Sequence, residues 1–79
     1  MICANAGLFV LPAGNAFPPH RLPGEVTLQC LAGRLALDVD GVRQVLGAGQ
    51  LCFLEGGVQH GLVGLEDSSA LVTLVLRGG

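Results

Sequence analysis

The stretch EVTLQCLAGRLALDVDGVRQVL, residues 25–46, decides the fold. Val26, Leu28 and Cys30 alternate with threonine and glutamine, which is the period-two pattern of a strand with one buried face. Asp40-Gly41 lies between two further apolar runs of the same stretch. An Asp-Gly pair favours a type I′ turn, because both central residues of that turn need a positive φ. The stretch therefore predicts one strand followed by a β-hairpin.

Segments of strand length lie on both sides of this stretch, separated by turns rich in glycine or polar residues. Strands are expected over 1–14, 25–30, 34–39, 42–46, 51–54 and 70–76. Short, evenly spaced strands of this kind are typical of an all-β sandwich or barrel. The four prolines disfavour a helix in the first third of the chain. We expect residues 1–79 to form one domain.

The chain is short and strongly apolar. Of its 79 residues, 51% are hydrophobic and only 13% are charged. A domain of this size buries only about 60% of the surface that its unfolded chain exposes, so it gains stability from a partner. Large exposed apolar patches are rare on monomers. We therefore expect a homodimer that buries Leu8–Leu11 or Ala70–Leu76, with a monomer of apolar surface as the alternative.

The charge pattern excludes several partners. The net charge is −2, and the basic residues are four scattered arginines without a lysine. Nucleic acids and anionic membranes need clustered cations, so neither is expected as a partner. The apolar stretch at the N-terminus is shorter than the ~20 residues of a membrane-spanning helix. It also lacks the basic start of a signal peptide.

The cysteines are three in number, Cys3, Cys30 and Cys52, and form no Cys-x-x-Cys pair. This spacing is neither a disulfide framework nor a zinc motif. Cys30 and Cys52 lie in apolar strands, where small buried hydrophobic side chains are a better interpretation than reactive thiols. Cysteines kept as thiols indicate a reducing compartment, so we expect a cytoplasmic protein.

Glycines and two histidines carry a resemblance to a known family. The residues that resemble the two signature motifs of the cupins are Gly14, His20, Pro23, Gly24, Glu25 and Gly33 for the first motif, and Gly49, Phe53, Gly57 and His60 for the second. The similarity extends over residues 23–76. It implies a double-stranded β-helix, that is, a jelly-roll barrel of two antiparallel sheets, with a pocket inside the barrel.

The resemblance also implies where a metal would be held. In metal-binding cupins the pocket holds a divalent ion on three histidines and one glutamate. His20 and His60 stand at the first and last histidine positions, but Leu22 and Val26 stand at the second histidine and glutamate positions. Glu25 is the neighbour of Val26, and a shift of one residue sends a strand side chain to the opposite face.

The even-numbered residues around these positions share one strand face. The expected pocket is therefore lined by His20, Leu22, Val26, Leu28, Cys30 and His60. Two imidazoles fall short of the three protein ligands of a catalytic zinc site. In one interpretation the histidines contact a small molecule without a tightly bound metal, and in another they are unrelated to each other. In a third, water, Gln29, Glu55 or Cys52 completes a two-histidine metal site.

Three functions stay open at this point. The first is a cupin whose mostly apolar pocket binds a small molecule, with enzymatic activity left undecided. The second is a metal-dependent enzyme of the dioxygenase or isomerase type that uses His20 and His60. The third is a structural or regulatory dimeric module whose pocket is filled by its own side chains. No cofactor is expected beyond a weakly bound divalent transition metal.

Overall fold

The computed structural model describes the backbone of residues 2–77 and the side chains of residues 4–19 and 21–75. All regular elements of this part are strands: β1 (Ile2–Leu11), β2 (Ala16–His20), β3 (Glu25–Ala32), β4 (Arg34–Val39), β5 (Val42–Gly47), β6 (Leu51–Leu54), β7 (His60–Gly64) and β8 (Ser68–Arg77). They form two four-stranded sheets, in the orders β1-β8-β3-β6 and β2-β7-β4-β5. Every strand pair is antiparallel. The predicted all-β jelly roll is thus confirmed.

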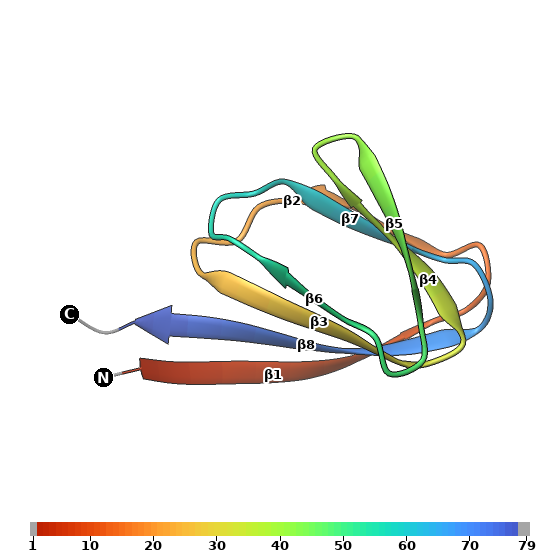
Figure 1. Ribbon diagram of the computed structural model, residues 1–79, viewed down its shortest axis with the longest axis horizontal. Helices are drawn as coiled ribbons and strands as arrows, with labels where there is room; N and C mark the ends of the chain where they lie inside the picture. Colours follow the sequence, from red (N-terminus) through yellow and green to blue (C-terminus); the bar gives the residue numbers. More distant parts are fainter. Residues whose placement is uncertain (1, 78–79) are drawn as a thin grey trace.

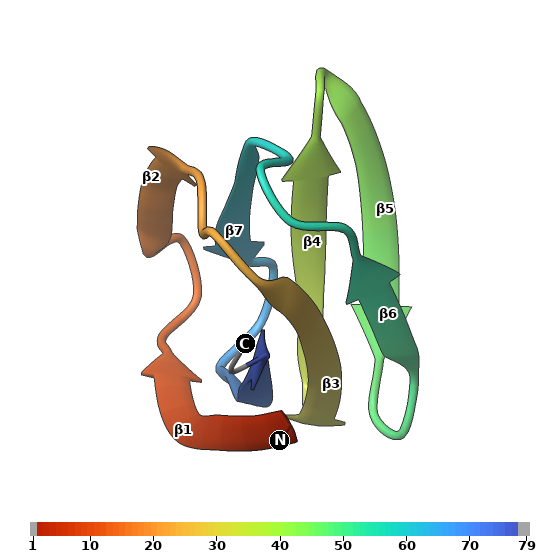
Figure 2. The same ribbon diagram turned by 90° about the vertical axis from the view of Figure 1, so that its left-hand side faces the viewer.

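The two sheets make a wedge (Figure 1). They lie close together at the end where the chain passes from β3 to β4, and they diverge towards the other end. Figure 2 shows the edge strands β1 and β2 at one side of the wedge and the edge strands β5 and β6 at the other. The interior between the sheets is therefore widest away from the β3–β4 connection.

The alternation of β3 places its even-numbered residues in the core, as the sequence predicts. Val26, Leu28 and Cys30 are 2%, 1% and 0% exposed. The opposite sheet meets them with buried leucines of β4, β5 and β7. The buried apolar residues that form this core are Leu11, Val26, Leu28, Cys30, Leu35, Leu37, Leu46, Leu54, Leu62 and Ala70.

The Asp40-Gly41 turn has the predicted geometry. The φ angles of Asp40 and Gly41 are 48° and 81°, both in the left-handed region. Val39 and Val42 are direct partners in the register, so the loop contains only two residues. These are the features of a type I′ hairpin.

β2 lies in a segment to which the sequence pattern assigns no strand and in which the prolines disfavour a helix. The segment pairs with β7, and its register shifts between Phe17 and His20, around Pro18 and Pro19. Proline cannot donate a ladder hydrogen bond and is tolerated at sheet edges and bulges. β2 is an edge strand, so the prolines are compatible with it.

Gly33 is the joint between the two sheets, because it lies between β3 of one sheet and β4 of the other. Its φ is +74°, and a Cβ at this position would run into the carbonyl oxygen of Asp67 and lie 3.0 Å from the Cα of Ser68. The carbonyl oxygen of the next residue, Arg34, accepts two hydrogen bonds, from the amides of Leu65 and Glu66 at 3.0 and 3.2 Å. The β3–β4 and β7–β8 connections are therefore packed backbone against backbone.

We predict that Gly33→Ala lowers the free energy of unfolding by about 3 kcal/mol, because strain in φ and a clash with the backbone act together. Gly41→Ala is the matched control, because Gly41 has the same sign of φ but nothing within 4 Å of its Cβ position. It should cost about 1 kcal/mol from backbone strain alone. Equilibrium unfolding in urea measures both free energies. If both variants lose the same stability, the close backbone contact at Gly33 does not contribute as described.

Candidate functional site

A cavity of ≈ 370 Å³ lies between the two sheets. The side chains that line it are Phe9, Phe17, Pro18, Leu22, Val26, Leu28, His60, Leu62 and Val72. They come from both sheets and from the connection between β2 and β3. Among these described side chains His60 is the only one with a polar group. The cavity is thus an apolar chamber with an imidazole on its wall.

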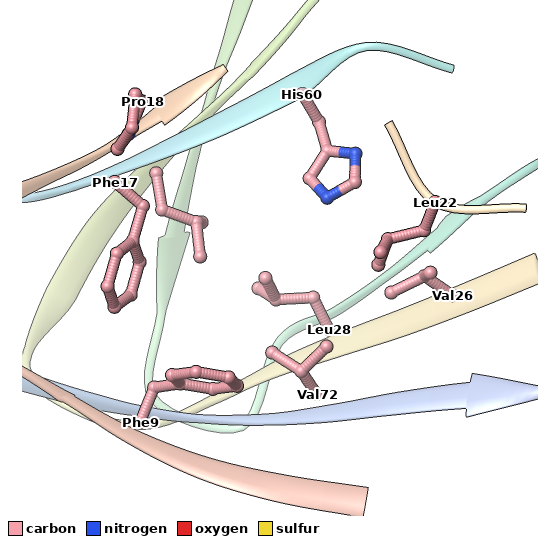
Figure 3. Close-up of a pocket in the computed structure, with 9 residues that line it drawn as sticks. Phe9, Phe17, Pro18, Leu22, Val26, Leu28, His60 and Val72 are labelled. Atoms are coloured by element: carbon pink, nitrogen blue, oxygen red, sulfur yellow. The ribbon is translucent and has the colours of Figure 1, made fainter. Parts of the chain in front are cut away.

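Two aromatic rings connect the sheets at one side of the cavity. Phe9 belongs to the edge strand β1 and Phe17 to the edge strand β2. Their ring centroids are 5.5 Å apart at an interplanar angle of 77°, which is an edge-to-face contact. Figure 3 shows these rings near the end where the sheets converge, whereas His60 and Leu22 lie towards the wider end.

His60 is the first residue of β7 and is only 5% exposed. Its ring extends into the space bounded by Leu22, Val26 and Leu28 (Figure 3). Nδ1 lies 3.1 Å from the carbonyl oxygen of Val58. A carbonyl oxygen can only accept, so Nδ1 carries the hydrogen in this bond. In the neutral ring Nε2 is then a hydrogen-bond acceptor.

His60 also borders a polar groove of ≈ 430 Å³ on the outside of the cavity. The other residues of this groove are Pro19, Asp38, Asp40, Gly41 and Gln59. Arg43 donates to both carboxylate oxygens of Asp38, at 2.9 and 3.1 Å, and this contact lowers the pKa of Asp38 from its ordinary value. His60 therefore lies where the apolar interior meets a polar rim.

The register brings the two histidine positions together. His20 of β2 and His60 of β7 are direct Cα partners on neighbouring antiparallel strands. The side chain of His20 lies outside the described residues. The backbone thus places both histidines of the chain at one location in the fold, although 40 residues separate them in the sequence.

Three further residues of the expected pocket, Leu22, Val26 and Leu28, line the cavity together with His60. Cys30 does not belong to this lining. It faces the same side of β3 as Val26 and Leu28, but it is fully buried, and its thiol lies 3.5 and 3.6 Å from the carbonyl oxygens of Ala32 and Gly33. Cys30 is therefore a core residue at the β3–β4 joint.

The sequence pattern does not indicate five of the lining residues, which are Phe9, Phe17, Pro18, Leu62 and Val72. Residues 70–76 are apolar at nearly every position, so alternation alone does not show that Val72 points inwards. In β1, Phe9 is two residues from the buried Leu11, so the alternation of the strand places both side chains on its inner face. Phe17 and Pro18 belong to a strand that the sequence does not predict.

The described residues do not fit the ligand set of metal-binding cupins. No group of three or more histidine, cysteine, aspartate or glutamate side chains that could hold a metal occurs among them. Leu22 and Val26 face the cavity with hydrocarbon groups, and Glu25 is not part of the lining. The three residues considered for completing a site, Gln29, Glu55 and Cys52, do not line the cavity either.

Burial raises the pKa of the Cys30 thiol, and the hydrogen bond to Ala32 only partly offsets this effect. We therefore predict that Cys30 resists a thiol reagent such as DTNB in the native protein, because the thiolate is the reacting form. The measurement uses a variant with Cys3→Ser and Cys52→Ala, in which only Cys30 can react.

One equivalent of reagent should be consumed only after urea is added.

The thiol of Cys30 has a higher pKa in the folded chain than in the unfolded chain, where it titrates near 8.5. Raising the pH through that range should therefore also favour the unfolded chain, and rapid modification of the native variant at pH 7 would contradict the burial of Cys30.

The structure is a two-sheet jelly roll with an apolar cavity between its sheets. A family model described as "Cupin domain" matches residues 7–76. The chain therefore belongs to the cupin family, as the motifs around His20 and His60 predict. No protein with a curated function matches the chain.

Solved structures share this fold. A cupin superfamily protein from Desulfitobacterium hafniense has a TM-score of 0.87 at 13% identity, over 98% of this chain and 79% of the other. An RmlC-like cupin from Shewanella frigidimarina has a TM-score of 0.86 at 24% identity, over 94% of this chain and 67% of the other. A mutant of salicylate 1,2-dioxygenase from Pseudoaminobacter salicylatoxidans has a TM-score of 0.86 at 17% identity, over 90% of this chain but only 20% of the enzyme. At these identities the similarity concerns the fold alone.

No helix able to span a membrane occurs among the described residues.

Proposed function

We propose that this cupin binds a small organic molecule with an apolar body and a hydroxyl-type polar group, and that His60 meets the polar group. The observation that carries the proposal is the ≈ 370 Å³ cavity, whose described lining is hydrocarbon except for His60. Pockets that bind small molecules typically combine an apolar lining with a few placed polar groups.

The size of the cavity sets the size of the ligand. A cavity of about 150 Å³ accommodates benzene, so ≈ 370 Å³ corresponds to a body of roughly 15 non-hydrogen atoms. Phe9 and Phe17 offer aromatic contacts to such a body. A hydroxyl group can both donate and accept a hydrogen bond, so a ligand hydroxyl suits a position beside the imidazole of His60. A cavity of this size favours ligand binding over a module whose pocket is filled by its own side chains.

The test uses 1-naphthol, an aromatic body with one hydroxyl, and measures binding by calorimetry or by NMR titration. Val72→Phe should lower the affinity at least tenfold, which is about 1.4 kcal/mol, because the larger side chain occupies the cavity. Val45→Phe is the matched control, since Val45 is 45% exposed on β5 and lies outside the cavity lining.

His60→Leu should weaken 1-naphthol but leave naphthalene unchanged, because only the first ligand has a hydroxyl for the imidazole. If Val72→Phe and Val45→Phe both bind 1-naphthol as the natural chain does, the proposed site is wrong. If His60→Leu weakens both ligands equally, His60 has only a packing role.

The metal-dependent alternative depends on the resemblance of the motifs around His20 and His60 to those of metal-binding cupins. The described residues do not support it, since Leu22 and Val26 supply no ligand atom. We predict that Leu22→His together with Val26→Glu creates a divalent metal site beside His60. At a Ni²⁺ concentration 100 times the Kd, binding contributes about 2.7 kcal/mol, which should raise Tm by about 10 °C or more.

The natural chain should show no comparable rise in Tm when Ni²⁺ is added, and His60→Ala in the double variant should abolish the rise. A large stabilisation of the natural chain that His60→Ala removes would instead support the metal-dependent function.

We further propose that the protein acts in the cytoplasm. Cys30 and Cys52 are free thiols in the structure, and a reducing compartment preserves that state.

A further inference from the structure

The cavity lies towards one side of the wedge, the side of the edge strands β1 and β2 (Figure 2). Its lining comes from β1, β2, β3, β7, β8 and the β2–β3 connection, and it includes no described residue of β4, β5 or β6. The most exposed lining residues belong to the two edge strands. Phe9 of β1 and Phe17 of β2 are each 38% exposed, and Pro18 of β2 is exposed as well. The cavity therefore comes closest to the surface between β1 and β2.

The wider end of the wedge is closed by two connections, β2–β3 and β6–β7. The amide of Gly57 donates to the carbonyl oxygen of Leu22 at 2.8 Å, which ties one connection to the other. Arg21 donates to the side-chain oxygen of Gln59 at 3.1 Å. His60 lies at this end and is only 5% exposed. A ligand that entered here would have to separate these hydrogen-bonded connections.

A glycine leaves a gap in the cavity wall at the edge of β1. The register places Leu28, Val72 and Gly7 in one row across β3, β8 and β1, and the first two line the cavity. The row ends at Gly7, which has no side chain. A Cβ at this position would lie 3.4 Å from Cε2 and 3.7 Å from Cζ of Phe9. The ring of Phe9 therefore covers the gap.

We infer that the entrance of the cavity lies between β1 and β2, and that Gly7, Phe9 and Phe17 select flat aromatic ligands over rounded ones. The inference rests on the proposed function, because it concerns how the same ligand reaches the same cavity. β1 and β2 belong to different sheets, so no ladder of backbone hydrogen bonds joins them. The two rings, with centroids 5.5 Å apart, bridge the strands instead.

The rings set the thickness of what can pass. A ligand enters only when the ring of Phe9 moves away from that of Phe17. Because Gly7 has no Cβ, the ring of Phe9 can move towards β1 by roughly the space of the missing methyl group. Such an opening admits the edge of a planar ring more readily than a rounded hydrocarbon. An aromatic ligand also gains ring contacts with both phenylalanines as it passes.

Stopped-flow kinetics with two alcohols test the selection. 1-Naphthol and 1-adamantanol have the same number of carbon atoms and one hydroxyl each, but the first is flat and the second is rounded. The natural chain should bind 1-naphthol at least tenfold faster, with 1-adamantanol followed by its competition for the fluorescent 1-naphthol. Phe9→Ala should remove most of this difference. Equal association rates of the two alcohols with the natural chain overturn the selection, and so does a difference that Phe9→Ala leaves unchanged.

Gly7→Leu tests the position of the entrance. The leucine fills the gap and presses the ring of Phe9 towards Phe17, so association and dissociation of 1-naphthol should both slow about tenfold. The Kd should change little, because residue 7 does not belong to the cavity lining. Gln44→Leu is the matched control, since Gln44 is exposed on the edge strand β5 and pairs with the core residue Leu37. It should leave both rates unchanged.

The outcomes separate the entrance from the binding site. Natural rates in a folded Gly7→Leu variant, verified by circular dichroism, overturn the entrance while the cavity still binds. Faster association in Gln59→Ala, which loses the hydrogen bond from Arg21, would place the entrance at the wider end instead. If the natural chain does not bind 1-naphthol, the proposed function is wrong and the entrance with it. The comparison of the two alcohols on the natural chain requires no variant to fold.

Discussion

The architecture depends on the close approach of two backbones at Gly33. At this position the chain leaves one sheet for the other, and the carbonyl group of Asp67 occupies the space that a side chain would need. The approach fixes the narrow end of the wedge, and the core between the sheets closes around it. The opposite end stays open enough to leave a cavity, so the ligand site proposed here is a consequence of where the sheets are joined.

Much of the fold could be predicted because its determinants are local. The alternation around Val26 and the two-residue turn at Asp40-Gly41 are encoded by neighbouring residues, and both are present in the structure. β2 could not be predicted in this way, because what permits Pro18 and Pro19 in a strand is its position at a sheet edge. That position is set by pairing with β7, a segment more than 40 residues away in the sequence.

The sequence predicts which residues face the space between the sheets, but not which of them line the cavity and which lie in the closely packed core. Leu22, Val26 and Leu28 line the cavity with His60, in keeping with their even-numbered spacing. Cys30 has the same parity but lies where the sheets converge, and alternation along one strand carries no information about the distance between two sheets. Val72 enters the cavity through the register between β8 and β3, which depends on both strands together.

The edge-to-face pair of Phe9 and Phe17 has a kinetic consequence. These rings join the edge strands of the two sheets without a backbone hydrogen bond between the strands, so the seam is held by side-chain packing. Rotamer changes of partly exposed aromatic rings are far faster than the unfolding of a sheet. A small molecule that enters the cavity between β1 and β2 would therefore pass two aromatic rings that change rotamer rapidly. Exchange of a ligand by this route would not require either sheet to unfold.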